Sequence, residues 1–95
     1  MSLYVVVVDM AVRPDEEGNL ADRFSGPFMA AITAQPGFKS VELLRPTDGN
    51  SHLLVIRFTD QSLQQTWLAS DLHTQVWSPI EAHLSSYSVR TFHTV

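Results

Sequence analysis

Apolar residues along the chain form runs and stripes, and the runs predict four strands. The run Leu3–Val12 contains four consecutive valines, whose branched Cβ atoms favour an extended backbone. Because this run does not alternate with polar residues, we expect both of its faces to be buried in the centre of a sheet. Three more segments rich in β-forming residues predict strands at Phe38–Arg45, His52–Thr59 and Tyr87–Val95.

A stripe of apolar residues spaced four apart predicts a helix from about Asn19 to Gln35. Asn19 is the expected N-cap, because its side chain can accept a hydrogen bond from a free backbone N–H. Gly26-Pro27 lies inside the stripe and should kink or split the helix. The stripe consists of Leu20, Phe24, Phe28 and Ile32.

A second amphipathic segment runs from Leu63 to Leu84, behind a cap at Asp60 and a helix start near Gln61. We expect Ser70-Asp71 to break this segment or to cap a second helix. Ser78-Pro79-Ile80-Glu81 has the form of a capping box with proline at the first helical position, which predicts a last short helix. The apolar line of the segment consists of Leu72, Val76, Ile80 and Leu84.

The predicted order is β–α–β–β–α–β. Two helices with four strands indicate an α+β fold, a ferredoxin-like sandwich whose antiparallel sheet carries both helices on one face. Apolar residues occupy both faces of the first and third strands, so the face away from the helices would be left bare. We therefore predict a homodimer formed through this open sheet face.

The amino-acid composition narrows the partners and cofactors to be expected. The chain has 95 residues, enough for one domain, and ten acidic against six basic residues give a net charge of −4. The bases are scattered singly, and no apolar run approaches the ~20 residues that span a bilayer, so neither nucleic acid nor a membrane is an expected partner. The absence of cysteine fits a reducing cytoplasm. No glycine-rich phosphate loop or metal-spaced cluster occurs, so no cofactor and no metal are predicted.

The candidate chemistry lies within Leu63–Leu84. Trp67 and Trp77 are ten residues apart with His73 between them, so the three rings are placed to meet in one cavity. Imidazole titrates near pH ~6.5, which makes His73 the candidate catalytic base, and the two indoles are candidates for stacking on a flat substrate. A structural alternative is open for all three residues. His73 would then hydrogen-bond at the helix break near Ser70-Asp71, and both tryptophans would pack in the core.

Two further residues are candidates for substrate binding. Phe28 would form part of the pocket wall or belong to the core. Arg57 would hold a substrate anion, lie exposed on its strand, or form an ion pair across the dimer. The remaining histidines receive no role. His83 is expected to be solvated, while His52 and His93 lie near strand ends.

One family pattern covers nearly the whole chain. Gln35–Phe38, Val41–Arg45, a polar hairpin, Leu53–Phe58, and Trp67–Asp71 followed by His73 resemble the antibiotic biosynthesis monooxygenase (ABM) domain family. The resemblance implies a single ABM-like domain over residues 1–95 and the dimeric α+β barrel of that superfamily. Family members include cofactor-independent oxygenases that turn anthrone-like aromatics into quinones, haem-degrading monooxygenases, and domains of no known activity.

The haem-degrading branch carries an asparagine on the first strand, a tryptophan on the second helix and an axial histidine about ten residues later. Trp67 matches the tryptophan, but Trp77 stands where the histidine would be, and Val6–Val8 offer no asparagine. The resemblance thus favours a cofactor-free monooxygenase of small aromatic or polyketide-like substrates, with His73 at a position where the family often has histidine. The alternatives are a non-catalytic dimeric small-molecule-binding domain and an isomerase or decarboxylase on the same barrel.

Overall fold

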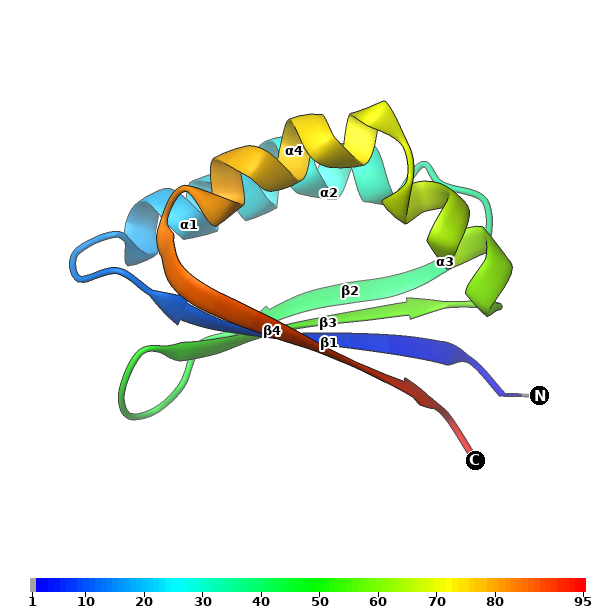
Figure 1. Ribbon diagram of the computed structural model, residues 1–95, viewed down its shortest axis with the longest axis horizontal. Helices are drawn as coiled ribbons and strands as arrows, with labels where there is room; N and C mark the ends of the chain where they lie inside the picture. Colours follow the sequence, from blue (N-terminus) through cyan, green and yellow to red (C-terminus); the bar gives the residue numbers. More distant parts are fainter. Residues whose placement is uncertain (1) are drawn as a thin grey trace.

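The computed structural model describes residues 2–95 as one sheet covered by helices (Figure 1). The order confirms the predicted ferredoxin-like α+β arrangement, with each expected helix divided into shorter pieces. The strands are β1 (Tyr4–Val12), β2 (Phe38–Leu44), β3 (Ser51–Phe58) and β4 (Leu84–His93). The first helical segment comprises α1 (Glu17–Arg23), η1 (Phe24–Phe28) and α2 (Met29–Ile32), and the second comprises α3 (Gln61–Leu68) and α4 (Asp71–Glu81).

The strand order is β2-β3-β1-β4, and every neighbouring pair is antiparallel. The valine-rich strand β1 is central, as predicted, with Val6 opposite Ile56 on one side and Thr91 on the other. All helices lie on one face of the sheet (Figure 1). The even-numbered residues of β1 pack beneath them, in the core, while Val5 and Val7 lie on the open sheet face. None of the helices in residues 2–95 is long and apolar enough to cross a membrane.

The first helical segment starts and ends earlier than predicted. It begins at Glu17, after Glu16 as N-cap, and α2 ends at Ile32. Asn19 is not the N-cap: it lies inside α1, where its Nδ2 donates to Glu16 Oε2 at 2.8 Å. The expected N-cap was therefore wrong, because this side chain satisfies a carboxylate of the preceding turn instead of a free backbone N–H.

The predicted break at Gly26-Pro27 takes the form of a π-helical turn, η1. An α-helix has 3.6 residues per turn, so residues spaced strictly four apart drift by about 40° at each step. A π turn holds more residues, since its hydrogen bonds run i→i+5. The wide turn therefore compensates the drift, and Leu20 and Ile32 at the two ends of the stripe are both buried on the sheet.

Side-chain caps define the second helical segment. Asp60 accepts a hydrogen bond from the Leu63 amide at 2.9 Å to begin α3, and Ser70 accepts from the His73 amide at 3.1 Å to begin α4, as predicted. These caps fix where the helix axis turns between α3 and α4.

Two expectations for the end of this segment were wrong. Ser78-Pro79 starts no new helix, and α4 continues through Pro79 to Glu81. Val76 and Ile80, at 8% and 1% exposure, anchor both sides of the proline on the core, which offsets the backbone hydrogen bond that proline cannot make. Leu84 is not helical but is the first residue of β4, three positions before the predicted strand start.

Gly37 connects the first helical segment to β2 directly beneath α3. Its φ is +81°, and a Cβ at this position would lie 2.5 Å from Leu63 Cδ1 and 2.8 Å from Thr59 Oγ1. Only glycine meets both the backbone conformation and this close approach. Gly37 therefore allows Leu63, and with it α3, to pack closely against the backbone just before β2.

Candidate functional site

A cavity of about 380 Å³ lies between the second helical segment and the sheet. Its walls come from β1, β3 and β4 below and from α3 and α4 above, with Phe28 of η1 also in the lining. The volume falls in the range of small-molecule sites. Apolar residues form most of the lining, and its polar side chains, besides two tyrosines, are Gln64, Gln65, His73, Glu81 and Thr91.

The structure brings Trp67, His73 and Trp77 together on the wall of this cavity. The His73 ring stands edge-on to Trp67, with centroids 5.2 Å apart, and lies nearly parallel to Trp77, with centroids 6.3 Å apart and an interplanar angle of 14°. The Ser70 cap produces this arrangement, because it starts α4 where His73 turns back towards Trp67 of α3. Tyr87 of β4 then meets Trp77 edge-on at 5.2 Å.

Burial among these rings lowers the pKa of His73 below its usual value of 6.5, because the low-polarity surroundings disfavour the charged imidazolium. His73 is therefore neutral at pH 7 and offers one ring nitrogen as a proton acceptor. Over residues 2–95 no hydrogen bond occupies its ring nitrogens; only its backbone amide bonds to Ser70. The imidazole is thus free to accept a proton from a bound molecule.

Gln64 is a cavity residue that the sequence reading missed. It is 5% exposed, yet among residues 2–95 its side-chain amide makes no hydrogen bond. It lies one helical turn before Trp67, whose indole packs edge-on against Phe28 with centroids 6.2 Å apart. Because His52 Nε2 is the one buried side-chain nitrogen or oxygen without a partner in residues 2–95, the Gln64 amide is not a fully buried group. It lines the cavity, where it can hydrogen-bond a polar atom of a ligand. Its spacing of three residues from Trp67 is the signal that would have placed it on the same face.

Glu81 and Tyr87 also line the cavity without having been predicted. His73, Trp77 and Glu81 follow one another at intervals of four, so they form one row along α4. The spacing was visible in the sequence, but the expected helix start at Ser78 separated Glu81 from the other two.

Arg57, proposed from sequence as an anion-binding residue, does not line the cavity. It lies on the open sheet face, because it alternates with Ile56 and Phe58, which face the helices. Its Nη1 is 3.3 Å from Glu42 Oε1 on the neighbouring strand, an ion pair within the chain that was not among the sequence-based alternatives. Phe28, in contrast, is both core and cavity wall, at 1% exposure.

His83 is not solvated as expected. Its Nδ1 is 2.8 Å from Glu16 Oε2, and its side chain is 18% exposed. Nearby, the Arg13 guanidinium donates through Nε to the Leu84 carbonyl at 3.0 Å. These contacts join the start of α1 to the turn after α4, outside the cavity lining.

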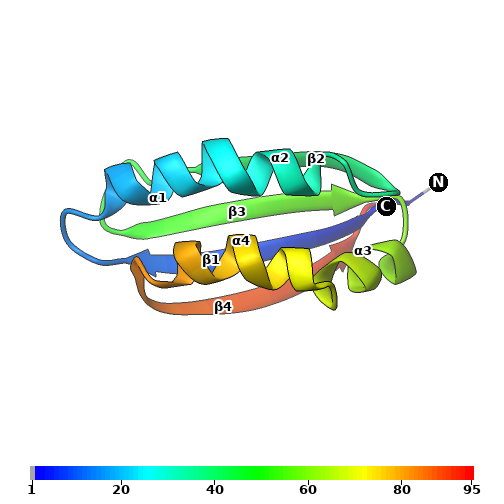
Figure 2. The same ribbon diagram turned by 90° about the horizontal axis from the view of Figure 1, so that it is seen from above.

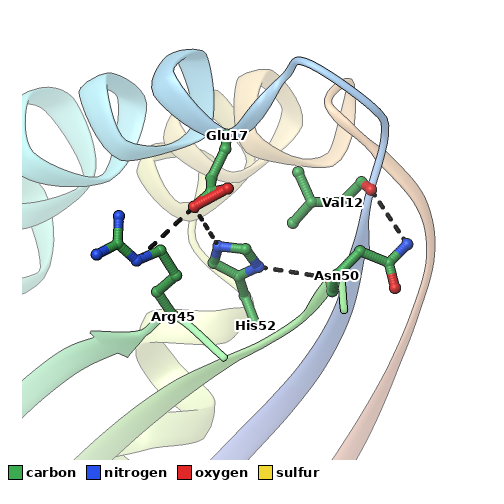
Figure 3. A network of polar contacts seen from close by, with 5 residues as sticks. All are labelled: Val12, Glu17, Arg45, Asn50 and His52. Atoms are coloured by element: carbon green, nitrogen blue, oxygen red, sulfur yellow. Dashed lines mark hydrogen bonds and ion pairs between the residues drawn. The ribbon is translucent and has the colours of Figure 1, made fainter. Parts of the chain in front are cut away.

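A separate polar network surrounds His52, to which sequence gave no role (Figure 3). His52 is 3% exposed, and its Nε2 lies 3.6 Å from Glu17 Oε1, too far for a hydrogen bond. Arg45 Nε is 3.9 Å from the same oxygen, and Asn50 Nδ2 donates to the Val12 carbonyl at 3.3 Å. The network holds the start of α1 against the β2–β3 hairpin, and none of its residues lines the aromatic cavity.

No group of three or more potential metal ligands occurs within residues 2–95, in either location. The aromatic cavity is the better candidate for function, because its mainly apolar lining includes a few polar side chains. Its arrangement suits the binding of a flat apolar molecule, with a proton acceptor against the edge of that molecule and an unpaired amide nearby.

Comparisons with known proteins agree with this architecture. A family model described as "Antibiotic biosynthesis monooxygenase" matches residues 3–77. No curated protein sequence matches the chain with significance.

Among solved structures, the chain is similar to a mutant of SnoaB, a cofactor-independent oxygenase from Streptomyces nogalater. The TM-score is 0.82 at 22% identity, covering 99% of this chain and 92% of that chain. A conserved protein from Methanosarcina mazei gives a TM-score of 0.85 at 11% identity, covering 97% and 92%. A heme-degrading protein from Mycobacterium tuberculosis gives 0.77 at 21% identity, covering 99% and 92%. At these identities the likeness concerns the fold alone.

Proposed function

The chain belongs to the antibiotic biosynthesis monooxygenase family, and from this premise we propose that it is a cofactor-independent monooxygenase of a small aromatic or polyketide-like substrate. The substrate would be a flat phenol or enol that contacts Trp67 and Trp77 in the cavity. Because these two indoles are nearly perpendicular, it would stack on one of them and meet the other with its edge. His73 would act as the catalytic base, and Gln64 and Phe28 would contact the bound ring system.

The proposed chemistry needs only groups that this site offers. Removal of a proton turns an electron-rich phenol or enol into an anion that can give electrons to O₂. In an anthrone-like substrate, one oxygen atom becomes a new ring carbonyl. The other leaves as water, together with the two hydrogens lost from the ring carbon. The protein's part is to take the proton, to hold the developing oxyanion and to keep bulk water away.

One observation carries the proposal: a neutral, partly buried imidazole lies between two indoles on the wall of an apolar cavity. A core histidine would ordinarily satisfy its ring nitrogens with protein partners. The unpaired amide of Gln64, 5% exposed in the same lining, adds a donor for an oxyanion.

The test is oxygen uptake with an anthrone, read together with tryptophan fluorescence corrected for ligand absorption. We expect saturable quenching and uptake in the wild type, and a fall in kcat of about 10²-fold or more in His73→Gln with binding kept. His83→Gln, outside the cavity, should retain the wild-type rate. Binding without uptake would favour the small-molecule-binding alternative, and turnover without O₂ would favour an isomerase or decarboxylase.

The proposal includes a homodimer through the open sheet face. The helices cover only the other face (Figure 1), and the open one carries Leu44 and Phe92 at 42% and 40% exposure. A second copy would cover these side chains, and the Arg57–Glu42 pair would lie at its rim. Sedimentation of a monomer at low micromolar concentration would contradict this. A cytoplasmic location stays a prediction.

A further inference from the structure

The cavity lining carries an acidic side chain and no basic one. No lysine or arginine of residues 2–95 contributes to it, and Glu81 is the single acidic residue of the lining. The family proposal makes no use of this carboxylate. An unpaired charge beside an apolar cavity acts on any ligand that brings a charge of its own.

The two ends of the cavity differ electrostatically along α4. His73 and Glu81 are eight residues apart, or about 12 Å along the helix axis, with Trp77 between them. His73 lies in the first turn of this 11-residue helix and Glu81 is its last residue. The helix dipole places partial positive charge at the first turn and partial negative charge at the last. The carboxylate and the dipole therefore both make the Glu81 end unfavourable for anions.

We propose that Glu81 selects the substrate by charge and sets its direction in the cavity. The acidic phenol or enol oxygen lies at the His73 end, and the portion of the ring system beside Glu81 is uncharged and preferably carries a hydroxyl donor. Aromatic acids with a carboxylate at that portion are rejected. This inference rests on the proposed function, since it assumes that a flat aromatic molecule occupies the cavity.

The selection should be moderate in size because Glu81 is exposed to solvent. Like charges in contact near a protein surface change binding by about tenfold at low ionic strength, and added salt weakens the effect. The consequence for a reaction sequence is that the step supplying this substrate leaves the portion beside Glu81 without a carboxylate, as a decarboxylation there would.

The experiment compares a dihydroxyanthraquinone with its carboxylic acid derivative by tryptophan-fluorescence titration at low salt. In the wild type we expect the acid to bind about tenfold more weakly than the neutral compound. Glu81→Gln should reduce this ratio to about threefold or less, and Glu81→Lys should make the acid the tighter ligand. Asp22→Asn, which makes the same change in net charge on the exposed surface of α1, should keep the wild-type ratio.

The outcomes separate the two proposals. Saturable binding of the neutral compound with one unchanged ratio in all four proteins would overturn the role of Glu81 and leave the cavity as a binding site. Absence of saturable quenching by either compound would overturn the proposed function itself, and the inference with it. A ratio that moves in Asp22→Asn as much as in Glu81→Gln would show an effect of net charge only, and would also overturn the inference.

Discussion

The two helical segments pack differently against the same sheet. The first segment lies over β2 and β3, and α4 of the second lies over β1 and β4 (Figure 2). Beneath the middle of the first, the interior is filled: Leu20 and Ile32 are 1% and 0% exposed. The hollow on this side lies at the α1 end and is lined mostly by exposed residues, Glu17 and Arg45 among them. Beneath the second there is a cavity, and two residues of its β4 wall, Tyr87 and Val89, are 42% and 52% exposed. We call these regions the filled half and the hollow half.

The difference indicates that, within this chain of 95 residues, one half contributes mainly to stability and the other mainly to ligand binding. A domain of this size has little apolar burial to spare. In the filled half the side chains are closely packed. In the hollow half some apolar side chains lack protein neighbours on one side, and a ligand can make the missing contacts. Stability and binding should therefore respond to substitutions in different halves.

The largest expected effect comes from one pair of matched truncations. Leu20→Ala in the filled half should lower the free energy of unfolding by about 3 kcal/mol, because a fully buried side chain leaves a void. Leu68→Ala at the cavity, where the side chain is 51% exposed, should cost less than ~1 kcal/mol. Urea unfolding at one fixed protein concentration measures both. Equal losses would show that the two halves do not differ.

Enlarging side chains should reverse the comparison. Ala31→Leu adds volume to the filled half, where the residue is 8% exposed, and should lower the free energy of unfolding by about 1–3 kcal/mol. Val89→Phe fills space in the cavity and should cost less than ~0.5 kcal/mol while it weakens binding of a dihydroxyanthraquinone. Thermal unfolding and fluorescence titration give the two readings. Undiminished ligand binding by Val89→Phe would contradict the position of the cavity.

The halves also differ in how their helices begin. Ser70→Ala removes the side-chain cap of α4 and should cost about 1 kcal/mol, with a further loss of oxygen uptake because His73 is placed by this cap. Asn19→Ala in the filled half should cost less than ~0.5 kcal/mol, because Asn19 caps no backbone N–H. Comparable losses in the two variants would contradict the assignment of Ser70 as the positioning cap.

The smallest expected effect is the dependence of stability on pH. The folded state holds the pKa of His73 below 6.5, so it binds fewer protons than the unfolded chain, and the free energy of unfolding should fall as pH drops below that value. Wild type minus His73→Gln isolates this slope in thermal unfolding between about pH 5 and 7.5. A difference that does not change over this range would contradict the burial of the imidazole.

Two carboxylates, those of Glu16 and Asp60, affect the pH dependence of stability in a separate, more acidic range. Hydrogen bonds from Asn19 to Glu16 and from the Leu63 backbone to Asp60 lower the pKa of each carboxyl below 4.5 and 3.8. Their folded states bind fewer protons than the unfolded chain as pH falls towards those values, so the stability that they contribute is present above them and is lost below. This loss is common to wild type and His73→Gln and cancels in the difference.

Sequence reasoning reached most of the fold because the strands and helices follow strong local patterns. The central strand β1 and the caps at Asp60 and Ser70 were all predictable. Local signals failed where packing decided the outcome. Ser78-Pro79 has the form of a helix start, yet Val76 and Ile80 hold one continuous helix on the core.

The candidate site was predictable only as far as one segment could show it. Trp67, His73 and Trp77 share the second helical segment, so their meeting follows from spacing. The contributions of Tyr87 and Thr91 depend on the register of β4 against β1, which no single segment reveals. Arg57 was misplaced relative to the cavity because strand residues alternate between two faces, and the sequence does not say which face the helices cover.

The π turn at Gly26-Pro27 has a consequence for variation in chain length. Leu20 and Ile32 are twelve residues apart, whereas eleven residues make about three turns of an α-helix. The first helical segment therefore contains one surplus residue. Deletion of Gly26 together with Pro27→Ala would let an ordinary α-helix keep both Leu20 and Ile32 on the sheet. This segment is accordingly a place where homologues can differ by one residue in length without a change in the core.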